Sequence, residues 1–302
     1  MTLNEVITVW GTAQAQSLVR RWEVGFRKVH PNVHVESRLT GSDVGMAGLY
    51  TGLADLAVLG RECTAFESKA FEWIFRYPPA QLQIMTGSLG QAEQSPALIA
   101  FVHRDNPLAR LTLVQLDAIF GPERLGGARN SIRTWGDLGL PGEWTDKSIN
   151  LYTHDIESGT GRFFRRVVLK DSAKMNWERL TEFKGPNAGR RILEALAADK
   201  AGLAVAGASS ESVPQVKALA LARAPADEAV AASRESLISG SYPLTRALYA
   251  YFNRPANAAL AAGLNEFLRY VVSPEGQRDV VVGTDYLPLS ARTARQQLEK
   301  LE

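Results

Sequence analysis

The sequence predicts a two-lobed α/β protein in which each lobe is a mostly parallel sheet flanked by helices. Segments with strand and helix periodicity alternate along the chain, which is typical of parallel sheets covered on both faces. The length of 302 residues suits two domains of ordinary size. Two long connections without turn signals, near 95–102 and 242–252, are interpreted as crossovers that join the lobes.

The first part of the chain shows this alternation most clearly. Strands are expected at 6–10, 33–39, 56–59, 82–86 and 97–103. A helix is expected after the first strand, because apolar residues recur there at helical spacing. These residues are Leu18, Val19, Trp22, Phe26 and Val29. Further helices are expected at 42–53 and 66–76.

The rest of the chain continues the pattern with longer loops. Strands are expected at 149–153, 203–206, 216–222 and 248–253. Helices are expected at 111–120, 187–199 and 275–282, and another is expected to start near 162. A further helix is expected where apolar residues form one face; these are Leu260, Leu264, Phe267, Leu268 and Val271. We predict one lobe from 1–95 and 246–302, and the other from 96–245.

The composition narrows the possible functions. Hydrophobic residues make up 45% and charged residues 22%, as in soluble globular proteins. The net charge of +2, from 34 basic and 32 acidic residues, gives no support for binding nucleic acid or a membrane surface. Cys63 is the only cysteine, so neither an internal disulfide nor a cysteine metal cage is expected. We expect no cofactor and no metal.

Three strand-to-helix turns are suited to binding an anion. They are Gly11-Thr12-Ala13, Thr40-Gly41-Ser42 and Ser158-Gly159-Thr160. A helix start leaves backbone N–H groups without intrahelical partners and carries the positive end of the helix dipole. Small hydroxyl residues beside a glycine allow an oxyanion to approach those donors. The turns therefore predict an anion site between lobes that close by a hinge.

Five motifs in a fixed order carry a family resemblance. They are Gly11-Thr12-Ala13, Gly41-Ser42-Asp43-Val44-Gly45, Ala54-Asp55-Leu56-Ala57, Glu157-Ser158-Gly159-Thr160 and Ser241-Tyr242-Pro243-Leu244-Thr245-Arg246. Over nearly its whole length the chain resembles the periplasmic phosphate-binding proteins of ABC phosphate transporters. The resemblance implies the type II periplasmic-binding-protein fold and a partner in the membrane, the permease subunits of an ABC transporter.

The resemblance also implies how a ligand is held. In that family a dehydrated phosphate is bound by backbone N–H groups and hydroxyls of these turns and by one aspartate. This implies contacts from Thr12, Ala13, Ser42, His154, Ser158, Gly159 and Thr160, with Asp55 as the hydrogen-bond acceptor. A carboxylate can accept only from an oxyanion that still carries a proton, so it favours phosphate over fully ionised sulfate.

Three positions depart from the family pattern. His154 stands where the family usually has arginine, Ala13 where it usually has a hydroxyl, and Glu157 where it usually has glycine. Loss of the arginine contact is expected to cost ~1.5–3 kcal/mol. A protonated His154 would recover part of this and strengthen binding below its pKa. Arg61 and Arg162 are candidate replacement cations.

Each of these residues also has an ordinary structural interpretation. Ser42 and Ser158 are typical helix N-caps, Asp55 is compatible with a strand end, and His154 with a structural hydrogen bond. Signatures of enzymes were sought as well. Residues 156–160 do not form a Gly-x-Ser-x-Gly elbow, and no Gly-x-x-x-x-Gly-Lys-Ser/Thr loop occurs.

The favoured function is therefore capture of a small tetrahedral oxyanion, with phosphate as first candidate, and delivery to an ABC permease. Sulfate, another oxyanion or a small organic phosphate stays open as ligand. The alternatives are a degenerate ligand sensor of the same fold, and a hydrolase that transfers a phosphoryl or acyl group with Ser158 and His154. We expect a monomer that is periplasmic or lipid-anchored outside the cell. Because the chain enters its first strand without a leader, a cytoplasmic protein is also compatible.

Overall fold

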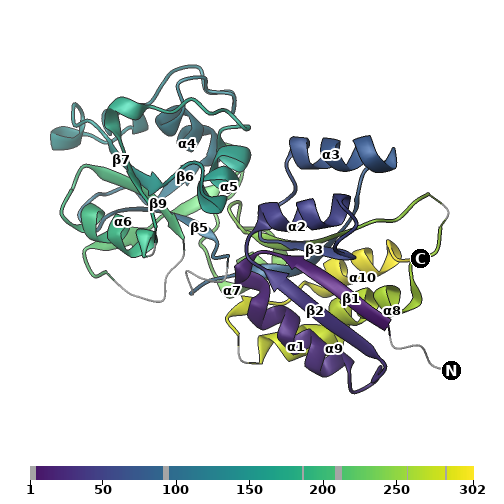
Figure 1. Cartoon of the computed structure of the whole chain (residues 1–302). Coiled ribbons are helices and arrows are strands. Elements are labelled where there is room, and N and C mark those ends of the chain that lie inside the picture. Colours follow the sequence, from purple (N-terminus) through teal and green to yellow (C-terminus); the bar gives the residue numbers. More distant parts are fainter. Residues whose placement is uncertain (1–4, 91–94, 186, 208–212, 257, 283) are drawn as a thin grey trace. The chain divides into compact units, whose positions relative to one another are not determined.

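The computed structural model describes residues 5–90, 95–185, 187–207, 213–256, 258–282 and 284–302 (Figure 1). The chain divides into two compact units. The first comprises Met1–Gly87, Glu93–Ser95 and Ala247–Glu302, and the second Ser88–Ala92 and Pro96–Arg246. Each unit is an α/β structure with its own sheet, so the predicted two-lobed α/β class is confirmed. The prediction of mostly parallel sheets is also confirmed, with one strand in each unit, Ala247–Phe252 in the first and Leu98–His103 in the second, that runs antiparallel to its neighbours.

The first unit is built on a six-stranded sheet in the order β13-β4-β12-β3-β1-β2. Its strands are β1 (Glu5–Gly11), β2 (Val33–Leu39), β3 (Leu56–Leu59), β4 (Ala80–Ser88), β12 (Ala247–Phe252) and β13 (Tyr286–Leu287). β1 runs parallel to β2 and β3, whereas β12 runs antiparallel to β3 and β4. The parallel group brings the carboxyl ends of β1, β2 and β3 to one edge of the sheet.

Helices cover both faces of this sheet (Figure 1). They are α1 (Gln16–Phe26), α2 (Ser42–Tyr50), α3 (Ala65–Phe75), α8 (Ala262–Val272), α9 (Pro274–Val281) and α10 (Ala291–Glu299), with a short 3₁₀ turn at Ala13–Ala15. Leu18, Val19, Trp22 and Phe26 are buried on α1, as their spacing predicted. Val29 is 64% exposed, because α1 ends at Phe26 before reaching it.

The second unit contains a five-stranded sheet in the order β10-β5-β9-β7-β8 and a two-stranded sheet of β11 and β6. The strands are β5 (Leu98–His103), β6 (Arg110–Thr112), β7 (Asn150–His154), β8 (Leu180–Phe183), β9 (Gly202–Gly207), β10 (Val216–Ala218) and β11 (Ala220–Ala222). The helices are α4 (Leu113–Phe120), α5 (Gly159–Val168), α6 (Ala188–Ala197) and α7 (Arg234–Ser239), with 3₁₀ turns at Gly136–Leu138, Gly142–Trp144 and Trp177–Arg179. The strand predicted at 216–222 is thus two strands in separate sheets.

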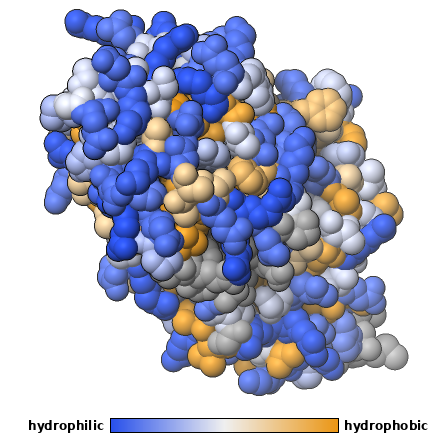
Figure 2. All heavy atoms as spheres, turned by 90° about the vertical axis from the view of Figure 1, so that its left-hand side faces the viewer, coloured by the Kyte–Doolittle hydropathy of each residue, from blue (hydrophilic) through white to orange (hydrophobic). Residues whose placement is uncertain are grey.

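One face of the molecule is drawn in Figure 2 by hydropathy. Hydrophilic residues predominate on this face, and hydrophobic residues occur in small groups (Figure 2). Within the part of the chain that the structure describes, no helix combines the length and the apolar character that crossing a membrane requires.

Candidate anion-binding site

Two of the predicted turns lie side by side in the first unit. Because β1 and β2 are parallel, with Gly11 opposite Leu39, both strands lead into their turns at the same edge. The Gly41 amide donates to the Gly11 carbonyl over 2.9 Å, and the Thr12 amide donates to the Val58 carbonyl over 2.9 Å. We call Gly11–Thr12–Ala13 and Gly41–Ser42 the unit-1 turns.

Close packing of glycines brings the start of α2 against the first turn. A Cβ atom on Gly45 would lie 3.0 Å from the Gly11 Cα and 2.9 Å from a methyl group of Leu59. A side chain at this position would therefore push α2 away from Gly11. Gly41 precedes α2, whose start has no side-chain cap among the described residues. Within the described part of the chain, the amides of the first turn of α2 therefore have no side-chain cap, an arrangement also found at helix starts that bind anions.

Asp55 does not join the unit-1 turns. It precedes β3, and its Oδ2 accepts a hydrogen bond from the Thr8 amide over 2.8 Å. Thr8 lies three residues before Gly11 on β1, which corresponds to roughly 10 Å along a strand. Asp55 therefore lies at the start of β3, level with the middle of β1, and away from the unit-1 turns to which it was expected to add an acceptor.

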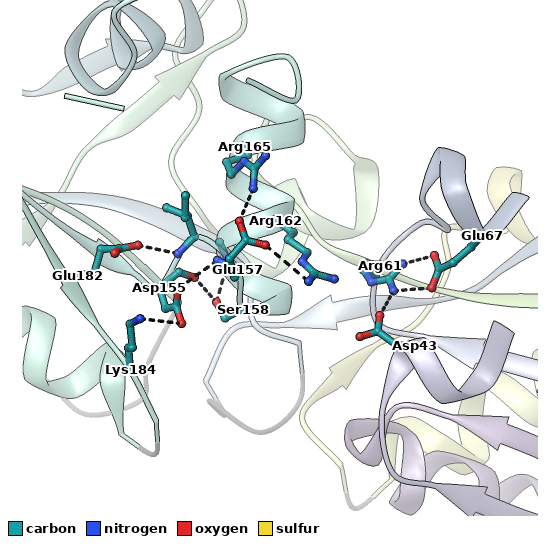
Figure 3. Close-up of polar contacts among 12 residues, drawn as sticks. Asp43, Arg61, Glu67, Asp155, Glu157, Ser158, Arg162, Arg165, Glu182 and Lys184 are labelled. Atoms are coloured by element: carbon teal, nitrogen blue, oxygen red, sulfur yellow. Dashed lines mark hydrogen bonds and ion pairs between the residues drawn. The ribbon is translucent and has the colours of Figure 1, made fainter. Parts of the chain in front are cut away.

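Arg61 lies just beyond the carboxyl end of β3, at the same edge as the unit-1 turns. Its guanidinium donates to both carboxylate oxygens of Glu67 at 2.7 Å and to Oδ1 of Asp43 at 2.5 Å (Figure 3). The side chain of Arg61 is 8% exposed and that of Asp43 is 74% exposed. Burial lowers the pKa of Arg61, but bonds to Glu67 and Asp43 raise it more, so the group stays charged. Two carboxylates thus already neutralise this candidate cation.

The third predicted turn, in the second unit, follows β7 and opens α5. We call Ser158–Gly159–Thr160 the unit-2 turn. Ser158 is the N-cap of α5, since its Oγ accepts from the Gly161 amide over 3.0 Å. The same hydroxyl donates to the Asp155 carbonyl over 2.6 Å. Its proton is therefore already bonded within the turn, and the N-cap interpretation of Ser158 is confirmed.

Thr160 is bonded to an arginine that the predicted site did not include. Nη1 of Arg246 donates to Oγ1 of Thr160 over 3.2 Å. Arg246 is only 3% exposed, and its guanidinium carbon lies 5.6 Å from the ring centre of Phe163. The residue ends the motif 241–246 that contributed to the family resemblance. That motif was the sequence signal for Arg246, although it assigned no role to the side chain.

His154 ends β7 beside the unit-2 turn. Its Nε2 accepts a hydrogen bond from the Gly207 amide over 3.3 Å. Burial, and then the positive charge of Arg246, lower the pKa of His154 to about 4. His154 is consequently neutral near pH 7. The predicted contribution of a protonated His154 to binding is therefore expected only in acid solution.

Charged side chains surround the unit-2 turn. Glu157 forms ion pairs with Arg165 at 2.8 Å and with Arg162 at 3.6 Å (Figure 3). Arg162, the second candidate cation, is therefore already paired with a carboxylate. Asp155 contacts Lys184 at 3.7 Å. Glu182 accepts from the Ile156 amide over 2.8 Å. Together with Arg246, these residues supply four cations against three carboxylates.

Ser158 and His154 do not form the pair that a hydrolase needs. An activated serine is hydrogen-bonded to its base. Here the Ser158 hydroxyl donates to the Asp155 carbonyl, and Nε2 of His154 accepts from Gly207. In the described part of the chain there is also no group of three or more histidine, cysteine or acidic residues arranged to hold a metal.

Two α/β units, each with a glycine-containing turn at the start of a helix, are compatible with the class of two-lobed solute-binding proteins. Comparison with known families agrees: the chain belongs to the PBP superfamily, whose domain matches residues 2–275. The chain is 31% identical over 292 residues to the phosphate-binding protein PstS of Pseudomonas aeruginosa strain PAO1. That match covers 96% of this chain and 85% of the relative. The resemblance to phosphate-binding proteins of ABC transporters is thus confirmed.

Solved structures show the same fold. PstS from Borrelia burgdorferi matches with a TM-score of 0.67 at 16% identity, over 95% of this chain and 100% of that one. An ABC-type phosphate transport receptor from Vibrio cholerae matches with a TM-score of 0.62 at 18% identity, over 93% and 99% of the two chains. At these identities the similarity establishes the periplasmic-binding-protein fold.

Proposed function

We propose that this protein captures inorganic phosphate and delivers it to the permease subunits of an ABC transporter. The proposal is carried by one observation: the turns to which the family resemblance assigns the ligand are built in both units as glycine-containing helix starts. The relative with 31% identity is itself named a phosphate-binding protein. We further propose a monomer that works in the periplasm or at the outer side of the membrane.

The proposed ligand contacts are a revised set. In the first unit they are Thr12, Ala13 and the start of α2 at Ser42. In the second they are the amides of Gly159 and Thr160 and the hydroxyl of Thr160. Ser158 holds the turn as N-cap, and His154 bonds the Gly207 amide.

Asp43 takes the acceptor role that the resemblance implied for Asp55. Its carboxylate lies in the first turn of α2, close to the unit-1 turns, and its side chain is largely exposed. A carboxylate here would accept a hydrogen bond from a protonated phosphate and would repel sulfate. This assignment makes ligand selection depend on a residue at the anion-binding edge of the sheet.

Isothermal titration of the whole chain with phosphate, arsenate, sulfate and molybdate at pH 7 tests the proposal. We expect heat from phosphate and arsenate and weak binding of sulfate. Asp43→Asn should narrow the preference for phosphate over sulfate by about tenfold, since it removes a charge-assisted acceptor. No heat from any of the four anions would contradict the proposed function.

A second measurement separates binding from catalysis. Turnover of a chromogenic phosphate ester is compared between the wild type and Ser158→Ala. We expect Ser158→Ala to leave any turnover of the ester unchanged, because the Ser158 hydroxyl already donates to the Asp155 carbonyl. Turnover that disappears in this variant would support the hydrolase alternative instead.

A further inference from the structure

Arg246 and Thr160 form a buried contact in the first turn of α5. Arg246 directly precedes β12, and its side chain is 97% buried by the surrounding protein, since only 3% is exposed. One edge of its guanidinium donates to Oγ1 of Thr160, and the guanidinium lies near the face of Phe163. These two contacts hold the cation at the first turn of the helix that carries the unit-2 turn.

The direction of this hydrogen bond decides what the Thr160 hydroxyl offers to a ligand. A hydroxyl has one proton and two lone pairs, whereas an arginine can only donate. Thr160 must therefore accept from Arg246, and its own proton stays available for another acceptor. Ser158 is the opposite case, because its proton is bonded to the Asp155 carbonyl. Of the two hydroxyls in the unit-2 turn, Thr160 is the one prepared to donate.

We infer that Arg246 is a positioning residue for the oxyanion, which orients the Thr160 hydroxyl to donate to the ligand and places a positive charge one hydrogen bond behind it. The inference rests on the proposed function. A donor that is itself hydrogen-bonded to a cation becomes more polarised and binds an oxyanion more strongly. The charge that the family supplies from the position of His154 is thus supplied from the start of β12.

The surroundings of His154 agree with this assignment. The imidazole faces the Gly207 amide from β9 and the charge of Arg246, and Gly189 of α6 lies nearby. The neighbouring charged groups are already engaged, Asp155 with Lys184 and Glu182 with the Ile156 amide. Removing Arg246 should therefore raise the pKa of His154, although burial, the larger cause, continues to lower it.

Titration of Arg246→Met with inorganic phosphate at pH 7 is the main test. We expect the affinity to fall about 10- to 100-fold, as for a lost charge-assisted contact. Arg246→Lys keeps the positive charge without the planar geometry of the guanidinium, so it should lose less phosphate affinity than Arg246→Met. Arg190→Met is the matched control, because Arg190 lies on α6 of the same unit in an exposed pair with Glu194. The control should bind phosphate as the wild type does.

A double-mutant cycle with Thr160→Val shows whether Arg246 acts through the hydroxyl. If it does, Arg246→Met should cost much less in the Thr160→Val background than in the wild type. Thr181→Val, at an exposed position on β8, controls for the change from threonine to valine. Costs that simply add would overturn the inference.

The pH profile is a readout that a purely structural role would not move. The ratio of wild-type to Arg246→Met affinity is measured from pH 5 to 8, so that titration of phosphate itself cancels. We expect the ratio to shrink only at the acid end of this range, because the variant lacks the charge of Arg246 but keeps the burial that also lowers the pKa of His154. A ratio that stays constant would count against the assignment.

The outcomes separate this inference from the proposed function. If the wild type binds no oxyanion, both fall together. If the wild type binds phosphate and Arg246→Met binds within threefold of it, only the role of Arg246 is overturned. Should Arg246→Met fail to fold, Arg246→Lys in the same cycle with Thr160→Val decides, since it keeps a buried cation.

Discussion

The two units hold their buried arginines in different ways. Arg61 in the first unit is 8% exposed and donates to two carboxylates, Glu67 and Asp43. Arg246 in the second unit is 3% exposed and donates to the neutral hydroxyl of Thr160. Burial and residue type are thus alike, but the groups that each arginine contacts differ. We therefore propose that the contacts of each arginine, more than the presence of a cation near a turn, determine its role.

Arg61 serves the architecture of the first unit. Glu67, which binds it through both oxygens, also accepts from the Thr64 amide and completes the capping box of α3. Asp43, its other partner, lies in the first turn of α2. Arg61 therefore ties the starts of α2 and α3 together through two carboxylates, one of which, Asp43, is also the proposed acceptor. Arg246 instead contacts the hydroxyl that we propose as a donor to the ligand.

The largest expected effect is a loss of unfolding free energy in the variant Arg61→Met. In this variant the carboxylate of Glu67 loses its paired cation, although the side chain of Glu67 is only 11% exposed. Breaking a buried ion pair by removing one partner costs about 3–5 kcal/mol of unfolding free energy. Urea denaturation at pH 7 measures this cost.

The comparison with Arg190→Met sharpens this prediction. Arg190 and Glu194 are both more than half exposed, so their pair should contribute at most about 1 kcal/mol. If Arg61→Met is no more destabilised than Arg190→Met, then Arg61 is not the structural cation of the first unit, and the contrast with Arg246 fails.

The next effect concerns His154 and pH. The pKa of His154 is about 4 in the folded chain, against an ordinary value of 6.5, so between these values the unfolded chain binds more protons. Unfolding free energy should therefore fall as the pH drops from 6.5 to 4, by up to about 3 kcal/mol, and this contribution should change no further below pH 4.

Denaturation of the wild type and His154→Gln at pH 7 and pH 5 isolates this contribution. The variant lacks the imidazole, so its loss of stability on acidification should be smaller than that of the wild type. Equal losses would show that His154 is not buried as a neutral group beside Arg246.

Packing of glycines gives a third comparison between the units. A Cβ atom on Gly161 would lie 2.2 Å from the Asp155 carbonyl oxygen, and one on Gly45 would lie 3.0 Å from the Gly11 Cα. Alanine at either position should cost about 1–3 kcal/mol of unfolding free energy, with the larger cost at Gly161, where backbone atoms lie closest. A Cβ on Gly159 meets nothing within 4 Å, so Gly159→Ala is the control. Thermal denaturation measures all three variants.

Much of the fold followed from local sequence patterns. Helical spacing predicted the buried face of α1 up to Phe26, and the alternation of elements predicted the α/β class. The antiparallel direction of β12 and β5 was not predicted, because these strands enter their sheets through long-range pairing that leaves no local pattern. Residues 216–222 were predicted as one strand but form two, β10 and β11. The division was not visible locally because the strands that pair with them, β5 and β6, lie far away in the sequence.

The candidate site was predictable where it depends on turns, and less so where it depends on side chains. Glycine and hydroxyl residues marked all three helix starts correctly. Asp55 was assigned its acceptor role from the resemblance alone, although it precedes the strand predicted at 56–59, and its hydrogen bond from the Thr8 amide could not be read from the sequence. The neutral state of His154 depends on burial and on Arg246, 92 positions away along the chain (246 less 154), which local sequence does not show.

The smallest predicted effect separates long-range charge from direct contact in the second unit. Glu157 is 61% exposed and already paired with Arg165 and Arg162, so Glu157→Gln removes a negative charge that solvent largely screens. Phosphate affinity should rise by about two- to fivefold, because exposed pairs are worth about 0.2–1 kcal/mol. Sulfate affinity should rise by the same factor, since Glu157 acts only through its field, and both gains should shrink in about 0.5 M salt, where the Debye length is about 4 Å. Titrations with both anions at two salt concentrations measure this. A gain for only one anion would mean that Glu157 touches the ligand, and the unit-2 turn would then contain an acceptor as well as donors.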